Sequence, residues 1–119
     1  MSNYYKPTHL AIEKKYPKLI RDRIPELFRA SKRKNAKTRV AKKDSEFLEF
    51  LLKKIVEESS ELQYSIKHGN LIEELADVFE IFEQILKLEK LKMKDIKAFQ
   101  KKKRKRNGGF TKRLLLLSD

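Results

Sequence analysis

Residues 57–77 read EESSELQYSIKHGNLIEELAD, and the predicted fold follows from this segment. Its middle, His68-Gly69-Asn70, separates two segments whose apolar residues recur at helical spacing. Gly69 suits the left-handed conformation that ends a helix, and Asn70 with Glu73 fits the N-cap and N3 positions of a capping box. The sequence therefore predicts an antiparallel pair of helices joined by a very short loop.

Four acidic residues are predicted to face the seam, the line along which these two helices meet. Glu58 falls inside the apolar arc of the first helix and Glu61 at its edge. Glu74 falls inside the apolar arc of the second helix and Asp77 at its margin, whereas three other acids point away: Glu73, Glu80 and Glu83. Because Glu61 and Asp77 both lie about 10 Å along their helices from the turn, we expect them to meet across it.

Such a cluster of carboxylates predicts a bound cation. Four carboxylates on an apolar seam would repel one another and lose hydration unless a positive charge is held between them. Hard divalent ions take oxygen ligands, and Mg²⁺ keeps several waters while it binds a phosphate substrate. The alternative interpretation is a solvated acidic face on a charged helix.

Composition limits the class of protein. A chain of 119 residues is one domain, and its lack of cysteine excludes a disulfide framework and thiolate chemistry. No apolar run approaches the roughly 20 residues that span a bilayer, and the polar start MSNYYKPTH lacks a signal-peptide core, so we expect a cytoplasmic protein with no membrane partner. The net charge of +13 fits nucleic-acid binding, attraction of small polyanions or a lysine-rich proteome, and composition leaves these open.

The flanking segments complete the predicted organisation. Residues 1–17 lack clear periodicity and are predicted to form an N-terminal arm before a domain at 18–119. A short helix is predicted from Pro25 to about residue 32, followed by a basic loop at 31–43 with an extended piece at 38–41. Asp44 or Ser45 is predicted to cap the first hairpin helix, which ends near residue 67, and the second runs from Asn70 to about residues 88–90.

The C-terminal third is strongly basic. A third amphipathic helix is predicted to begin at 93–95, to run into the basic residues 101–106 and to stop at Gly108-Gly109. This basic run fits a solvated helix end, a nucleic-acid or localisation patch, or the phosphate-binding flank of an active site. Residues 111–117, which include four consecutive leucines, are predicted to be extended against a core or a partner chain.

Three motifs resemble a known family. Glu57-Glu58-x-x-Glu61, twelve residues, then Glu74-x-x-Asp77 resembles the signature of the all-α nucleoside triphosphate pyrophosphohydrolases. This MazG-like superfamily includes phosphoribosyl-ATP pyrophosphohydrolase and the dimeric dUTPases. KLIRDRIPE at 18–26 and NGGFTKR at 107–113 resemble the ends of a small phosphoribosyl-ATP-pyrophosphohydrolase-like branch, so the resemblance spans residues 18 to about 116.

The resemblance implies an enzyme, a metal-dependent nucleotide pyrophosphohydrolase. It would use Mg²⁺, with Mn²⁺ as a substitute, to cleave a nucleoside triphosphate between the α and β phosphates. The products would be a monophosphate and pyrophosphate, and housecleaning of noncanonical nucleotides is one role for such an activity. The implied metal ligands are Glu58, Glu61, Glu74 and Asp77.

The resemblance also implies catalytic and substrate-binding residues. The implied catalytic residues are Glu57, Glu58 and Glu61, of which Glu57 is either a ligand or a water-orienting base. Family members carry an arginine directly before Gly-Gly-Phe, where this chain has Asn107. The candidates for holding the triphosphate are Arg21, Lys54, Lys103, Arg104 and Arg106; for Arg21 the other interpretation is an ordinary surface pair with a neighbouring aspartate.

We expect an all-α fold in which the antiparallel helical hairpin belongs to an oligomeric core of the four-helix-bundle type. The second hairpin helix is apolar around more than half of its circumference, which one chain cannot cover. The resemblance likewise implies a homodimer or homotetramer. Two alternatives to the enzyme remain: a basic helical protein that binds nucleic acid through 32–43 and 101–106, and a catalytically inactive interaction module.

Overall fold

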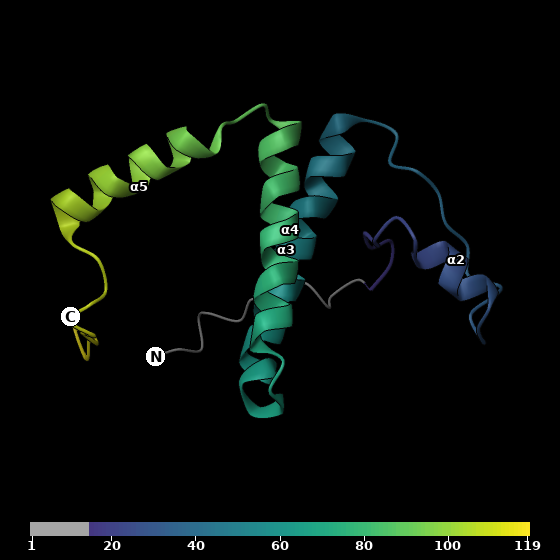
Figure 1. The fold of residues 1–119 in the computed structure, drawn as a ribbon, viewed down its shortest axis with the longest axis horizontal. Helices are drawn as coiled ribbons and strands as arrows, with labels where there is room; N and C mark the ends of the chain where they lie inside the picture. The colour runs from purple at the N-terminus through teal and green to yellow at the C-terminus, as the bar shows by residue number, and fades with distance from the viewer. Residues whose placement is uncertain (1–14) are drawn as a thin grey trace.

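The computed structural model describes residues 15–119, so most of the predicted N-terminal arm lies outside the described residues. Within this range the protein is all-helical, without strands (Figure 1). Its helices are α2 (Ile24–Arg29), α3 (Asp44–His68), α4 (Leu71–Leu88) and α5 (Met93–Asn107). The predicted all-α class is confirmed. No helix among these residues is long and apolar enough to cross a membrane.

The helices α3 and α4 form the predicted hairpin and pack closely against each other (Figure 1). Their seam follows a spacing of three and four residues, which keeps one face of each helix on its neighbour. The buried apolar side chains of the described chain are Leu51, Ile81 and Leu86, and all three belong to this pair. Glu58 and Ser65 are buried beside them, so polar groups occupy part of a small core.

The turn between α3 and α4 matches the prediction in part. Gly69 adopts the left-handed conformation with φ 76°, and the next backbone N–H, that of Asn70, donates to the carbonyl of Ser65 at 3.3 Å. The predicted capping box is wrong, because the Asn70 side chain makes no capping hydrogen bond. With φ −103° and ψ 21°, Asn70 lacks the extended conformation that aims an N-cap side chain at the first turn.

The other helix ends refine the predicted boundaries. Lys43, in an extended conformation, is the N-cap of α3, so the predicted caps Asp44 and Ser45 are instead helical. The carboxylate of Asp44 in the first turn still complements the helix dipole. At the end of α4, Lys90 has φ 56° and the N–H of Leu91 donates to the carbonyl of Leu86 at 2.8 Å. This bond turns the chain away from the hairpin before α5.

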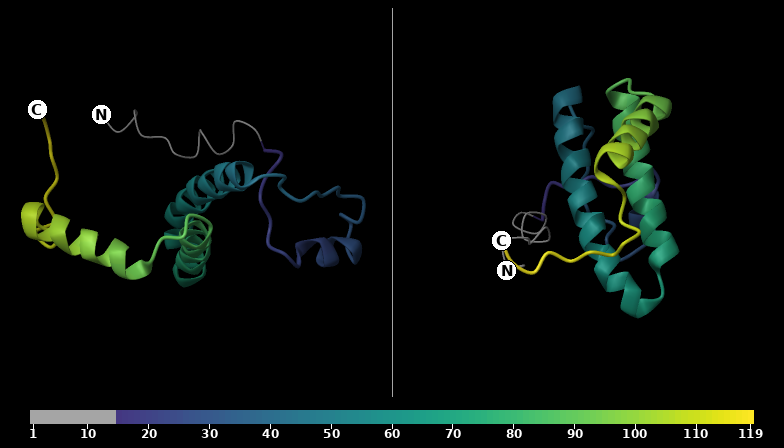
Figure 2. Two further views of the ribbon diagram at one scale, coloured as in Figure 1. Left: turned by 90° about the horizontal axis from the view of Figure 1, so that it is seen from above. Right: turned by 90° about the vertical axis from the view of Figure 1, so that its left-hand side faces the viewer.

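Two arms leave the hairpin on different sides (Figure 2). The segment that contains α2 extends on one side and α5 projects on the other, where none of its residues is buried. The leucines at 114–117 are 76% to 88% exposed. They do not lie against the core of the same chain, because the hairpin core is narrow and α5 carries them away from it. The alternative, contact with a partner chain, stays a prediction.

The hairpin leaves a second set of apolar side chains exposed. Ile72, Leu75 and Phe79 on α4 and Ile66 on α3 are each at least half exposed. At 100° per residue they lie on the flank opposite the one that carries Glu61 and Asp77. One flank of the hairpin is thus acidic and the other apolar.

Candidate functional site

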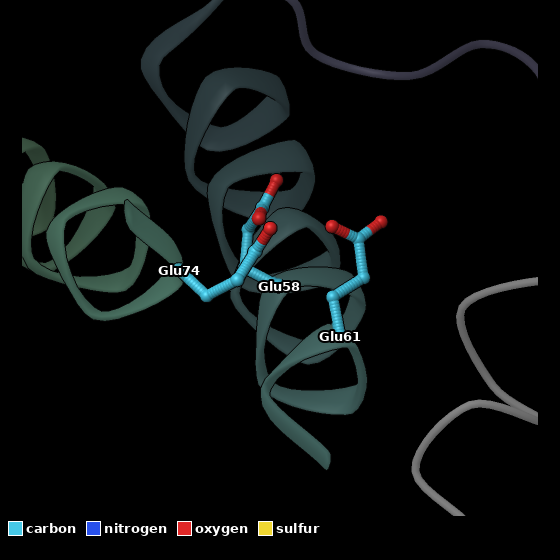
Figure 3. A group of neighbouring side chains, drawn as sticks. All are labelled: Glu58, Glu61 and Glu74. Carbon is cyan, nitrogen blue, oxygen red and sulfur yellow. The ribbon is translucent and has the colours of Figure 1, made fainter. Parts of the chain in front are cut away.

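Three glutamates converge at the acidic flank of the hairpin. Glu58 and Glu61 stand one turn apart on α3, and Glu74 reaches toward them from the first turns of α4 (Figure 3). One carboxylate oxygen from each lies within 4.8 Å of the other two. The tight turn at Gly69 places Glu74 opposite Glu61, so three of the four predicted ligands come together.

The pKa values of Glu58 and Glu61 are raised by burial and by the negative charge around them. Burial, and then the negative charge of Glu61, raises the pKa of Glu58 to about 7, against the opposing effect of Lys54. Burial and the charge of Glu74 likewise raise the pKa of Glu61. The ionised cluster is therefore unfavourable without a cation beside it.

The geometry of the cluster fits a hard divalent ion. The Oε2 atoms of Glu58 and Glu74 are buried and have no hydrogen-bond partner among residues 15–119. A buried carboxylate oxygen without a partner is costly, and a metal ion is one way to satisfy it. Around octahedral Mg²⁺, neighbouring oxygens are about 3 Å apart and opposite oxygens about 4.2 Å apart. The three glutamate oxygens, which lie within 4.8 Å of one another, therefore need only short side-chain movements to share an ion.

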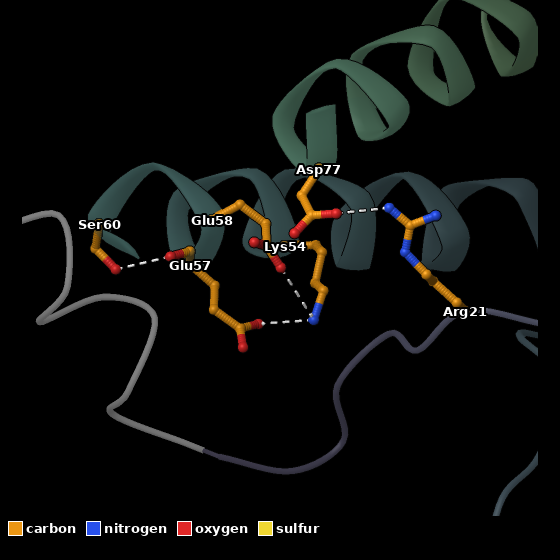
Figure 4. Close-up of polar contacts among 6 residues, drawn as sticks. All are labelled: Arg21, Lys54, Glu57, Glu58, Ser60 and Asp77. Atoms are coloured by element: carbon orange, nitrogen blue, oxygen red, sulfur yellow. Dashed lines mark hydrogen bonds and ion pairs between the residues drawn. The ribbon is translucent and has the colours of Figure 1, made fainter. Parts of the chain in front are cut away.

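Asp77, the fourth predicted ligand, is engaged by an arginine. Its Oδ1 accepts a hydrogen bond from Arg21 Nη2 at 2.7 Å (Figure 4). Asp77 lies near Glu58, where its charge helps to raise the pKa of that carboxyl. The prediction that Glu61 meets Asp77 across the turn is wrong. Glu61 meets Glu74 instead, because Asp77 lies nearly one turn further along α4.

Lys54 and Glu57 lie beside the cluster on α3. The Lys54 Nζ atom is 3.3 Å from Glu57 Oε2 and 3.6 Å from Glu58 Oε1 (Figure 4). Both side chains of the Lys54–Glu57 pair are partly buried. Lys54 thus balances part of the negative charge, and Glu57 is held next to the three-glutamate cluster without belonging to it.

An inner cavity of about 680 Å³ lies between the 18–28 segment and the hairpin. Glu58, Asp77 and Glu80 of the hairpin and Asp22 of the 18–28 segment are its acidic lining residues. The cationic lining residues are Lys18, Arg21, Arg23, Arg33 and Lys54. Glu80, which was predicted to point away, lines the cavity because the 18–28 segment crosses that side of α4. Sequence reasoning missed Arg23 and Arg33 as cavity residues, since an aperiodic segment gives no signal of where it folds back.

The predicted triphosphate-binding residues are divided by the fold. Arg21 and Lys54 line the inner cavity. Lys103, Arg104 and Arg106 lie in the exposed second half of α5, which projects away from the hairpin. Within one chain α5 does not bring them to the carboxylates, and their role remains a prediction.

No protein-family model, curated protein or solved structure matches this chain. The resemblance to the MazG-like superfamily therefore remains a prediction based on the three motifs.

Proposed function

We propose that this protein is a Mg²⁺-dependent nucleoside triphosphate pyrophosphohydrolase that cleaves between the α and β phosphates. The observation that carries the proposal is the cluster of Glu58, Glu61 and Glu74, in which two buried oxygens have no hydrogen-bond partner in the described part of the chain. The adjoining cavity is lined by cationic side chains that suit a polyphosphate. The order and spacing of the motifs at 18–26, 57–77 and 107–113 also support it.

The metal ligands in this proposal are Glu58, Glu61 and Glu74, and Asp77 joins them when Arg21 releases it. Once bound, Mg²⁺ or Mn²⁺ would neutralise charge on the phosphate oxygens and lower the pKa of the attacking water. Arg21 then has its guanidinium free to donate hydrogen bonds to a phosphate. Arg21 can exchange Asp77 for a phosphate with little loss of interaction energy, since both groups offer anionic oxygen acceptors.

Glu57 is the proposed proton acceptor. Lys54 holds its carboxylate at 3.3 Å, next to the cluster but outside it. The oxygen of a water bonds to the α-phosphorus, the bond from that phosphorus to the bridging oxygen breaks, and pyrophosphate leaves. The proton of the water goes to Glu57 and then to solvent. A carboxylate positioned in this way supplies general base catalysis.

The test is pyrophosphate release from a panel of standard and modified nucleoside triphosphates. We expect release with Mg²⁺, none with EDTA, and a loss of at least roughly 100-fold in Glu61→Gln. The matched control is Glu83→Gln, an exposed glutamate of α4, which should stay within about twofold of the parent rate. Absence of release from every nucleotide by a folded protein, or release that persists in EDTA, contradicts the proposal.

A second candidate, nucleic-acid binding, is favoured by α5. This helix carries eight basic residues and one acidic residue, and none of its residues is buried. Basic side chains that bind phosphates release counterions, so affinity for a duplex or single strand should fall steeply with salt. Replacing the basic residues at 101–106 by glutamine should remove that binding. Affinity that does not change with these replacements would exclude α5 as the binding element.

A further inference from the structure

A second cavity, here called the outer pocket, lies between residues 16–41 and the start of α3. Its volume is about 860 Å³. Three aromatic side chains line it, and they come from three separate parts of the chain: Tyr16, Phe28 and Phe50. Cavities of this size with apolar and aromatic walls are typical small-molecule sites.

The rim of the outer pocket is held by an ion pair. Arg39 donates two hydrogen bonds to Glu46, each 2.9 Å long, and the backbone N–H of Lys42 donates to the same carboxylate at 2.8 Å. These bonds tie the extended segment at 36–41 to the first turns of α3. The hydrogen bond from Arg39 lowers the pKa of Glu46 to about 2, so the pair stays ionised at neutral pH. The pocket is therefore formed without a ligand.

The chemistry of the walls favours a planar aromatic group that carries negative charge. Among the described residues of the lining Glu46 is the one acidic side chain, and Arg39 neutralises it. The other charged groups there are cationic: Lys18, Arg33 and Lys37. Arg33 lies 4.2 Å above the ring centre of Phe28, and Lys53 covers one face of Phe50 at 4.9 Å. Such cation-backed rings stack well with nucleobases.

The outer pocket adjoins the inner cavity. The two share five lining residues: Lys18, Leu19, Ile20, Phe28 and Arg33. The inner cavity reaches Glu58 and Asp77. On α3, Phe50 and Lys54 are one turn apart on the same face, so the pocket and the acidic flank follow one side of the helix. A ligand whose phosphates lie near Glu58 and Asp77 would reach Phe50 by following this side of α3.

We propose that the outer pocket binds the nucleoside of the triphosphate, with the base stacked on Phe50 and the sugar beside the residues that both cavities share. This inference rests on the proposed function and adds a specificity site to it. The enzyme then selects nucleotides over inorganic polyphosphates. The aromatic wall supplies most of this preference, because inorganic tripolyphosphate satisfies the cationic groups equally well.

The test compares two classes of probe, nucleotide and inorganic, by isothermal titration calorimetry in Mg²⁺. The probes are α,β-methylene nucleoside triphosphates, one purine and one pyrimidine, and inorganic tripolyphosphate. Phe50→Leu, which keeps an apolar side chain and removes the ring, should weaken nucleotide binding roughly 10-fold or more. Its binding of tripolyphosphate should stay within about twofold of the parent protein. Thermal unfolding shows that the variant is folded.

A second variant and a matched control make the result independent of any folding defect. Ala36→Trp places a ring in the outer pocket from its exposed side, and should also weaken nucleotide binding while it spares tripolyphosphate. Phe99→Leu on α5 makes the same chemical change as Phe50→Leu at a side chain that is 64% exposed, and should change neither affinity.

The results distinguish failure of the nucleoside site from failure of the proposed function. Equal affinities for nucleotides and tripolyphosphate, or nucleotide binding unchanged in both pocket variants, overturn the nucleoside site alone. The proposed function then stands if tripolyphosphate binding needs Mg²⁺ and Glu61. If neither probe binds in a Mg²⁺-dependent manner, the proposed function fails and the nucleoside site fails with it.

Discussion

The hairpin and α5 carry opposite charges in opposite environments. Residues 44–88 contain eleven acidic and four basic residues, whereas α5 has eight basic residues and one acidic residue. The hairpin holds the buried core and a buried glutamate, and α5 has no buried residue. In a chain of net charge +13, negative charge is concentrated in the helix pair that contains the buried core, and one of its carboxylates, that of Glu58, is itself buried. Burial, rather than the number of charges, separates a candidate site from a solvated face.

The largest expected effect comes from removing one buried charge of the hairpin. Glu58→Gln should lower pyrophosphate release at least roughly 1,000-fold, because it removes a proposed ligand. The same change should raise the melting temperature at pH 8 without metal, because a neutral amide replaces a buried carboxylate that lies beside Glu61 and Asp77. An inactive variant that also unfolds more easily would instead indicate a structural polar network.

The apolar flank of the hairpin offers the next test, of the predicted homo-oligomer. Phe79 is 56% exposed in one chain. If a partner chain covers it, Phe79→Glu should weaken association roughly 100-fold, since each buried phenyl ring contributes about 1.5–3 kcal/mol. Sedimentation should then show single chains. The same change at Phe99 on α5 is the control, and equal losses at both positions would place the interface on α5.

Between pH 5 and pH 8, stability should change with pH through the raised pKa values of Glu58 and Glu61 in the hairpin. The folded state raises the pKa of Glu58 to about 7, so its contribution to stability is fully present below the ordinary glutamate pKa and is lost as pH rises through about 7. Without metal the melting temperature should fall by roughly 5–10 °C between pH 5 and pH 8. Glu46, whose pKa is lowered to about 2, loses its contribution only in stronger acid and does not offset this fall.

A control for the pH experiment is Glu58→Gln, in which most of this fall should disappear. Glu61, whose pKa is also raised, would account for what remains. A melting temperature that rises from pH 5 to pH 8 in the parent protein would contradict the buried, partly protonated cluster.

The smallest effect is expected in α5. Replacing four of the six basic residues at 101–106 with glutamine should change the free energy of unfolding by less than about 0.5 kcal/mol, because these side chains are exposed and glutamine is a good helix former. Urea denaturation measures this directly. A loss of several times that amount would mean that α5 packs on a surface of the assembled protein.

Much of the hairpin could be predicted from sequence because its signals are local. The period of apolar residues placed α3 and α4, and the left-handed Gly69 separated them as expected. The positions of Glu58, Glu61 and Glu74 on their helices followed from the same period. The predicted capping role of Asn70 is wrong because the backbone angle ψ decides whether the side chain reaches the helix end, and at 21° it does not.

The remainder of the site depends on contacts between distant segments, and no periodic pattern in the sequence predicts such contacts. Arg21 and Asp77 are 56 residues apart, and nothing in either segment indicates that they meet. The outer pocket is built from the aperiodic residues 16–41, whose position is set by the pair of Arg39 and Glu46. The direction of α5 was likewise unpredictable, because its apolar side is short and none of its residues is buried against the hairpin.

The central claim is that Glu58, Glu61 and Glu74 form a divalent metal site, and a Mn²⁺ titration without nucleotide tests it most directly. Electron paramagnetic resonance measures free Mn²⁺ against the parent protein, Glu61→Gln and Glu83→Gln. We predict saturable binding that competes with Mg²⁺, is lost in Glu61→Gln and is retained in Glu83→Gln. Binding that is absent, or that falls equally in both variants, would contradict the claim and leave the cluster a protonated polar core.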